Sequence, residues 1–152
     1  MIATGGVDRV IRVFDIRSVT TSTAATGGLP LNAGIGAGQG GAKVLSEFRG
    51  HQHAIRKIAW SAHWGGVLMS AGYDMSVRIW EDSRLGKGMG IGVNGMAGFG
   101  AKLMGVFDKH TEFVVGLDWS LFGDTRWAAS VGWDEGVWVW DTKQVVQGMG
   151  MR

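Results

Sequence analysis

The chain of 152 residues contains no cysteine, a single proline and a single tyrosine. Without cysteine it has no disulfide, no thiolate nucleophile and no cysteine-ligated zinc site. No run of about 18 apolar residues is present, so the sequence predicts no direct membrane insertion, and its first residues lack the apolar core of a secretory signal. The 15 basic and 13 acidic side chains nearly cancel and form no basic cluster, which argues against nucleic-acid binding.

Glycine and tryptophan are abundant by contrast, with 27 glycines and eight tryptophans. Repeated aromatic residues separated by glycine-containing turns are typical of arrays of antiparallel β-strands. No long stretch has the periodicity of an amphipathic helix, which argues against a helix bundle. The composition therefore favours an all-β fold.

Several aromatic and polar residues recur in register, in two full copies of a repeat and one partial copy. The full copies run from Gly50 to Asp82 and from Lys109 to Asp141, and the partial copy runs from Ile2 to Asp15. In each copy a Ser or Thr lies four residues before an Asp, which lies six residues before a Trp or Phe. In the full copies a His precedes that Asp by 23 or 24 residues. The recurring residues are Thr4, Asp8 and Phe14; His51, Ser70, Asp74 and Trp80; and His110, Ser130, Asp134 and Trp140.

This Gly-His…Trp-Asp pattern is the signature of the WD-repeat β-propeller, in which each repeat forms one blade of four antiparallel strands. In such a blade the Asp lies in the turn between the second and third strands. There its carboxylate accepts from turn amides and from the His, the His reaches the Ser, and the Ser reaches the indole N–H of the Trp. A buried polar chain of this kind is stable only when every member is bonded.

A Ser/His/Asp set is also the composition of a nucleophilic triad. A single catalytic site does not recur with the period of the scaffold, so we interpret both sets as structural tetrads. In the partial copy Phe14 has no N–H to donate, and no His precedes Thr4, so the tetrad is shortened there.

The repeats predict an incomplete blade over residues 1–48, a complete blade over 49–108 and a last blade over 109–152. Glycine-rich insertions at 18–42 and 86–101 lengthen the repeat beyond its usual period of about 40–45 residues. We expect all-β structure, namely a partial WD-repeat propeller of about three four-stranded antiparallel blades. The predicted strands are 1–4, 10–15, 43–48, 54–60, 67–71, 76–80, 102–107, 113–119, 127–131 and 137–140, with a weak outer-strand candidate after Asp141.

Propellers usually close with about 4–8 blades, so three blades leave two apolar faces uncovered. We therefore expect the chain to be the C-terminal part of a larger propeller or a partial gene product. Assembly of several copies into a ring is the alternative.

Three stretches carry a more specific resemblance. HTEFVVGLDWSLF (110–122), followed by ASVGWDEGVWVWD, closely resembles the last repeat of the peroxisomal targeting signal type 2 receptor family. GHQHAIRKIAWSAH (50–63), followed by SAGYDMSVRIWE, resembles the penultimate repeat of that family, and IATGGVDRVIRVFDIR (2–17) resembles the repeat before it. The resemblance leaves out both glycine-rich insertions.

The resemblance implies a cytoplasmic cargo receptor that cycles to the peroxisome and its matrix. Members of the family bind the N-terminal type 2 targeting signal of a cargo protein, an amphipathic helix with a basic residue near its start. A co-receptor helps to seal the site, and docking peroxins receive the complex. The resemblance implies no cofactor and no enzymatic activity. The alternative is a WD-repeat scaffold in another multiprotein complex, such as a ubiquitin-ligase adaptor or a chromatin subunit.

In a propeller, the loops that enter the innermost strand and the turns between the second and third strands share one face. On that face Tyr73, Phe113 and Trp133 are candidates to receive the apolar side of a signal helix. Glu112 and Glu135 are candidates to pair with its basic residue. The alternative for each is an ordinary rim residue, as for Gln52, His53, Met75 and Thr111.

Arg56, Lys57 and Arg78 fit solvated strand faces or pairs between blades. His53 and His63 have no ligand at metal-binding spacing beside them, so we predict turn or surface positions and no metal site.

Overall fold

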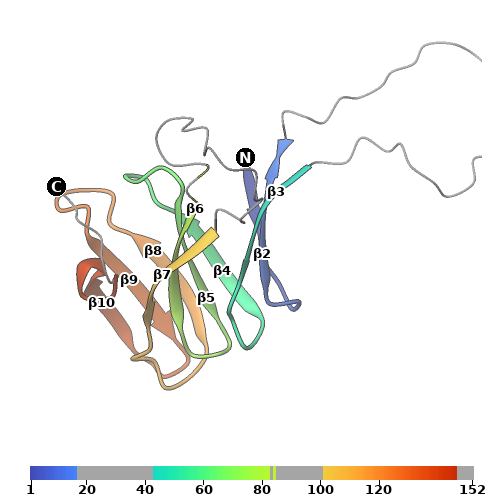
Figure 1. Ribbon diagram of the computed structural model, residues 1–152. Helices are drawn as coiled ribbons and strands as arrows, with labels where there is room; N and C mark the ends of the chain where they lie inside the picture. The colour runs from blue at the N-terminus through green and yellow to red at the C-terminus, as the bar shows by residue number, and fades with distance from the viewer. Residues whose placement is uncertain (17–42, 83, 85–100, 147–152) are drawn as a thin grey trace, which may run out of the picture.

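The computed structural model describes residues 1–16, 43–82, 84 and 101–146, which form three antiparallel sheets side by side (Figure 1). The sheets have three, four and three strands, and the described residues contain no α-helix. This confirms the prediction of an all-β chain, although only the central sheet has four strands.

Each sheet corresponds to one blade, and its strands follow one another along the chain. The glycine-rich insertions at 18–42 and 86–101 lie almost wholly outside the described residues. The first blade contains β1 (Ile2–Thr4), β2 (Val10–Asp15) and β3 (Lys43–Arg49); the second contains β4 (Ile55–Trp60), β5 (Val67–Gly72), β6 (Val77–Asp82) and β7 (Ala101–Phe107); and the third contains β8 (Val114–Trp119), β9 (Trp127–Gly132) and β10 (Val137–Asp141).

The second blade is buried on both faces, as β5 shows most clearly. All six residues of this strand are buried, and successive side chains of a strand point to opposite faces. Met69 and Ala71 therefore pack in one core with Leu117 and Trp140 of the third blade. Leu68 packs in a second core with residues of the first blade. The continuous apolar run VLMSAG thus fits a strand between two neighbouring blades.

The outward face of the third blade is also apolar, but among the described residues nothing covers it. Val137 and Val139 are 72% and 65% exposed, and Val137 pairs with the exposed Val131 of β9. On the first blade Ile2 and Val44 are exposed in the same way.

After β10 the chain does not continue as an outer strand, so the prediction of a strand after Asp141 is wrong over 142–146; residues 147–152 lie outside the described part. Thr142–Gln144 form a 3-10 turn, capped by Asp141 accepting from the Lys143 amide at 2.9 Å. The amides of Val145 and Val146 both donate to the Thr142 carbonyl, at 3.1 and 2.9 Å.

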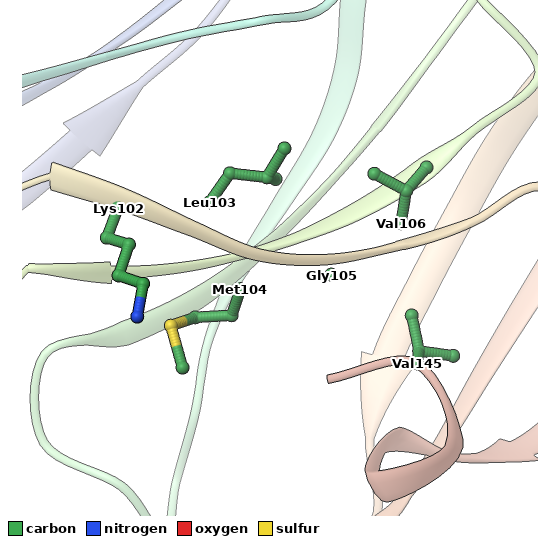
Figure 2. Close-up of a pocket in the computed structure, with 6 residues that line it drawn as sticks. All are labelled: Lys102, Leu103, Met104, Gly105, Val106 and Val145. Atoms are coloured by element: carbon green, nitrogen blue, oxygen red, sulfur yellow. The ribbon is translucent and has the colours of Figure 1, made fainter. Parts of the chain in front are cut away.

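This turn lies against β7 of the second blade, where Figure 2 shows Val145 facing Gly105. A Cβ atom on Gly105 would lie 2.3 Å from the Val145 carbonyl oxygen. Only glycine therefore allows this approach without a shift of the backbone.

We expect Gly105→Val to lower the free energy of unfolding by about 1–3 kcal/mol, because the new side chain must displace the Thr142–Val146 turn. The measurement is urea denaturation followed by tryptophan fluorescence. Gly6→Ala is the matched control, since a Cβ atom there meets nothing within 4 Å. Equal stability of the two variants would show that the contact between the Thr142–Val146 turn and Gly105 does not stabilise the fold.

Candidate functional site on the propeller rim

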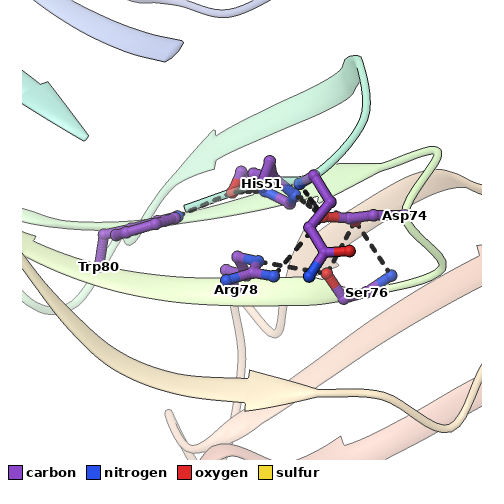
Figure 3. Close-up of polar contacts among 7 residues, drawn as sticks. His51, Asp74, Ser76, Arg78 and Trp80 are labelled. Carbon is purple, nitrogen blue, oxygen red and sulfur yellow. Dashed lines mark hydrogen bonds and ion pairs between the residues drawn. The ribbon is translucent and has the colours of Figure 1, made fainter. Parts of the chain in front are cut away.

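The second blade contains a complete polar tetrad between its turn and its strands (Figure 3). His51 Nδ1 lies 2.9 Å from Asp74 Oδ2, and His51 Nε2 lies 2.6 Å from Ser70 Oγ. The Trp80 indole N–H donates to the same Ser70 oxygen at 2.8 Å. The structure thus brings together all four residues that the repeat spacing singled out.

The third blade repeats this arrangement. His110 Nδ1 lies 2.8 Å from Asp134 Oδ2, and His110 Nε2 lies 2.8 Å from Ser130 Oγ. The Trp140 indole N–H donates to Ser130 at 3.3 Å. Both His rings and both Ser side chains are buried, so solvent does not reach either Ser oxygen. Similar distances occur in a nucleophilic triad, so the structural interpretation rests on the burial of the Ser side chains and on the recurrence of the set in both blades.

The direction of the hydrogen bonds follows from the donors available. Because the ionised Asp74 carboxylate only accepts, His51 Nδ1 is the donor of that pair. Nε2 of the neutral ring accepts from the Ser70 hydroxyl, whose oxygen accepts from the Trp80 N–H. His51 then carries its proton on Nδ1 and donates it to Asp74. In this tautomer every member of the chain is bonded.

The two tetrad carboxylates are held in their ionised form. Burial opposes ionisation of Asp74, but hydrogen bonds from His51, from the Gln52 amide and from Ser76 outweigh it and lower the pKa well below its usual value. Burial likewise opposes ionisation of Asp134, and the amides of Thr111 and Gly136 together with His110 lower the pKa of that carboxyl.

These pKa values give stability a definite pH dependence. A carboxyl whose folded pKa lies below its unfolded value of 3.8 stabilises the fold fully above that value. The contribution is lost as the pH falls through about 4 toward the folded pKa, because the unfolded chain then binds more protons. We expect these two carboxyls to make the free energy of unfolding decline as the pH falls below about 4.

Urea titrations between pH 3 and 7 measure this dependence. The matched variant carries Asp74→Asn and Asp134→Asn, which remove both titrating groups. It is expected to be less stable at neutral pH and to show a shallower acid decline. An unchanged slope in the variant would assign the acid sensitivity to other groups.

The residue after the tetrad Asp has the same unusual backbone in every blade. Arg9, Met75 and Glu135 have φ angles of 64°, 61° and 57°, in the left-handed region that non-glycine residues rarely adopt. The turns require this conformation because the Asp side chain accepts from the amide two residues further on, at Val10, Ser76 and Gly136. Residue type does not predict this feature, because none of the three residues is a glycine or an asparagine.

In the first blade Asp8 has a different partner from the other two. Its carboxylate pairs with Arg12, which also donates to Glu47 at 3.0 Å. The corresponding Arg78 of the second blade lies 3.6 Å from Asp74 of its own blade. The prediction that Arg78 is solvated or pairs between blades is therefore wrong, because the tetrad carboxylate is its nearest anion.

The turns between the second and third strands and the connections between blades lie together at one end of the stack, the lower edge in Figure 1. We call this surface the rim; it comprises residues 5–9, 50–54, 73–76, 108–113 and 133–136. It is continuous from blade to blade, because the Ile55 amide donates to the Gly6 carbonyl at 3.0 Å. Tyr73 of the second blade then stacks on Phe113 of the third, with ring centroids 4.7 Å apart.

Three aromatic side chains form a cluster on this rim. The Trp133 ring lies 5.3 Å from that of Phe113 and 6.4 Å from that of Tyr73. Backbone bonds fix their positions, since the Tyr73 amide donates to the Ala54 carbonyl and the Trp133 amide to the Phe113 carbonyl, both at 2.9 Å. Trp133 is nevertheless 63% exposed, so the cluster presents a large aromatic surface to solvent.

Two carboxylates flank the aromatic cluster. Glu112 directly precedes Phe113 and Glu135 follows Trp133 by two residues, and both side chains are exposed. Within the described part of the chain neither Glu forms an ion pair. The candidate residues Tyr73, Glu112, Phe113, Trp133 and Glu135 thus share one surface across the second and third blades.

The other predicted positions contribute less to this surface. Arg56, Lys57 and His53 are exposed, as expected for solvated strand and turn positions. His63 lies in a turn, as predicted, but it is half-buried and bonds the Ser120 carbonyl at 2.7 Å, which joins the second and third blades. The described residues contain no group of three or more His, Cys, Asp or Glu side chains able to hold a metal ion.

Comparison with known families agrees with the repeat pattern. The family described as "WD domain, G-beta repeat" matches residues 42–81 and 101–141, which is more than half of the chain. The chain belongs to the WD-repeat family.

Within the WD-repeat family the chain is similar to several receptors. It is 41% identical over 104 residues to the Peroxisomal targeting signal 2 receptor of Komagataella phaffii, covering 68% of this chain and 28% of that protein. It is 37% identical over 143 residues to the Saccharomyces cerevisiae protein of the same name, covering 93% of this chain and 37% of the relative. Peroxisome biogenesis protein 7 of Arabidopsis thaliana is 32% identical over 112 residues, with 71% of this chain and 27% of that protein covered.

The chain therefore spans between a quarter and two fifths of the length of these relatives. In the described residues, no helix has the length and hydropathy needed to cross a membrane.

Proposed function

We propose that these three blades form part of a cargo receptor that binds an N-terminal type 2 peroxisomal targeting signal on its rim. The observation that carries the proposal is the aromatic cluster of Tyr73, Phe113 and Trp133, in which Trp133 is exposed and the other two rings are half-buried, flanked by Glu112 and Glu135. The chain that carries it is similar over 93% of its length to a protein named Peroxisomal targeting signal 2 receptor.

The chemistry of this surface fits an amphipathic helix with a basic residue. The apolar side of such a helix would cover the aromatic rings, and aromatic anchors usually provide most of the affinity of an interface. A cation over Trp133 contributes about 0.5–1 kcal/mol, and an exposed pair with either Glu about 0–1 kcal/mol. The rings therefore supply affinity, and the carboxylates select for a cationic ligand.

Further blades are part of the proposal. The exposed apolar faces of the first and third blades resemble the faces buried between blades in the core. In the complete receptor we expect additional blades to cover them, and a co-receptor to contact the bound signal. Such a receptor would pass its cargo to docking peroxins and cycle between the cytoplasm and the peroxisome. The proposal involves no enzymatic step.

A chimaera tests this proposal most sharply. In the Saccharomyces cerevisiae relative, the region that matches 93% of this chain is replaced by the chain itself, so that the rest of that protein is kept. In cells that lack the relative, a fluorescent reporter with a type 2 signal is followed by microscopy. We expect the chimaera to restore a punctate peroxisomal signal.

A diffuse reporter, in cells where the chimaera is abundant and protease-resistant, would contradict the proposal. Co-purification from the same cells distinguishes the alternative. Enrichment of another multiprotein assembly without peroxins would indicate a WD-repeat scaffold instead.

A further inference from the structure

We propose that the rim fixes the direction of a bound helix, with the helix N-terminus over the third blade and its C-terminus toward the first blade. This inference rests on the proposed function, because it requires a helical ligand on the rim. Its basis is the order of charges along the three blades.

The three left-handed turn residues place different chemistry at equivalent points of the repeat. Arg9, Met75 and Glu135 each follow the Asp of their blade, share one backbone conformation and are exposed. Because the backbone is the same, the three side chains leave their blades in equivalent directions. The sequence of groups across the rim is therefore a cation, a thioether and an anion.

The neighbouring charges strengthen this order. Glu112 adds a second carboxylate on the third blade. By contrast, Asp8 on the first blade pairs with Arg12, whose other partner Glu47 also pairs with Arg49. Lys109 and Asp108 are adjacent and exposed, so their charges offset each other. Among the described residues, no ion pair involves Arg9, Glu112 or Glu135, which leaves these charges to act on a ligand.

This order of charges favours one orientation of a bound helix, because the two ends of a helix carry opposite partial charges. Its N-terminus carries roughly half a positive charge and its C-terminus roughly half a negative charge. One orientation sets the N-terminus beside Glu112 and Glu135 and the C-terminus beside Arg9, and the opposite orientation sets like charges together. The aromatic cluster and Met75 accept an apolar side in either direction, so the charges make the choice.

Disulfide trapping tests the direction, and the absence of cysteine in this chain makes the experiment simple. Val7→Cys places a single thiol on the first blade, Gln52→Cys on the second and Thr111→Cys on the third. All three residues are exposed and uncharged, so the charges under test are kept. A type 2 signal peptide carries one cysteine at its N-terminus or one at its C-terminus, activated as a mixed disulfide so that the protein thiolate displaces the leaving thiolate, and a scrambled peptide of equal composition is the control.

We expect the N-terminal thiol to trap Thr111→Cys faster than Val7→Cys by about tenfold, and the C-terminal thiol to show the reverse preference. Gln52→Cys should react similarly with both peptides. Equal or opposite preferences, with trapping well above that of the scrambled peptide, would overturn the direction and leave the proposed function standing. Trapping no better than that of the scrambled peptide at every position would overturn peptide binding itself.

A charge exchange separates electrostatics from shape. Arg9→Glu combined with Glu112→Arg and Glu135→Arg reverses the order of charges and leaves the aromatic cluster in place. We expect the end preference to reverse in this background. A preference that survives unchanged would show that ring packing, rather than charge, orients the helix.

Discussion

Replacing His51 or His110 with alanine is expected to lower the free energy of unfolding by about 2–4 kcal/mol. Each imidazole bonds a buried Ser hydroxyl and a carboxylate that is ionised at neutral pH. Its removal leaves both groups short of a partner and opens a void beside the Trp indole. Urea denaturation of the purified chain, followed by far-ultraviolet circular dichroism, measures the loss.

His53→Ala is the matched control for this experiment. His53 lies two residues from His51 on the same connection, but its side chain is exposed. We expect it to change stability by less than about 0.5 kcal/mol. If His51→Ala were equally mild, the tetrad would be an incidental set of contacts rather than the element that holds the turn to the strands.

Truncation of the aromatic cluster should have the largest effect on ligand binding. We expect Trp133→Ala and Phe113→Ala each to weaken binding of a type 2 signal peptide by about tenfold or more, as for central aromatic anchors of other interfaces. Glu112→Lys should weaken it as well, since it reverses a charge next to the rings. Fluorescence anisotropy of a labelled peptide gives the dissociation constants.

Phe122→Ala is the control for aromatic surface in general. Phe122 is 87% exposed but lies in the β8–β9 connection, at the end of the third blade opposite the rim. It should leave peptide affinity unchanged. Equal weakening by Phe122→Ala and Trp133→Ala would indicate non-specific binding of the peptide to aromatic surface. Unchanged affinity in both Trp133→Ala and Glu112→Lys would show that the peptide does not bind at the rim.

The tetrads and most strands could be predicted from the sequence because their determinants are local or periodic. His110 and Asp134 are 24 residues apart, yet the repeat of the same spacing in the second blade marks them as partners. The strand β5 likewise follows from the apolar run VLMSAG between two turns. That Tyr73, Phe113 and Trp133 lie on one surface follows from the loops that share one face of a propeller, whereas their ring contacts do not follow from the sequence.

The features that could not be predicted depend on particular contacts, which the spacing of residues in the sequence does not indicate. The segment after Asp141 has the composition of a strand, but it turns back because Gly105 of the neighbouring blade leaves room for the Val145 carbonyl. The bond from His63 to the Ser120 carbonyl joins loops of different blades in the same way. The left-handed turn residues follow from the Asp hydrogen bonds rather than from residue type.

The most direct test of a peptide-binding rim is a nuclear magnetic resonance titration of the isotope-labelled chain with a type 2 signal peptide. We predict saturable shifts of the Trp133 indole N–H and of the Tyr73, Glu112 and Phe113 amides, with the Leu121 and Phe122 amides unmoved. Shifts confined to the β8–β9 connection, or none at all beyond those caused by a scrambled peptide, would contradict the account.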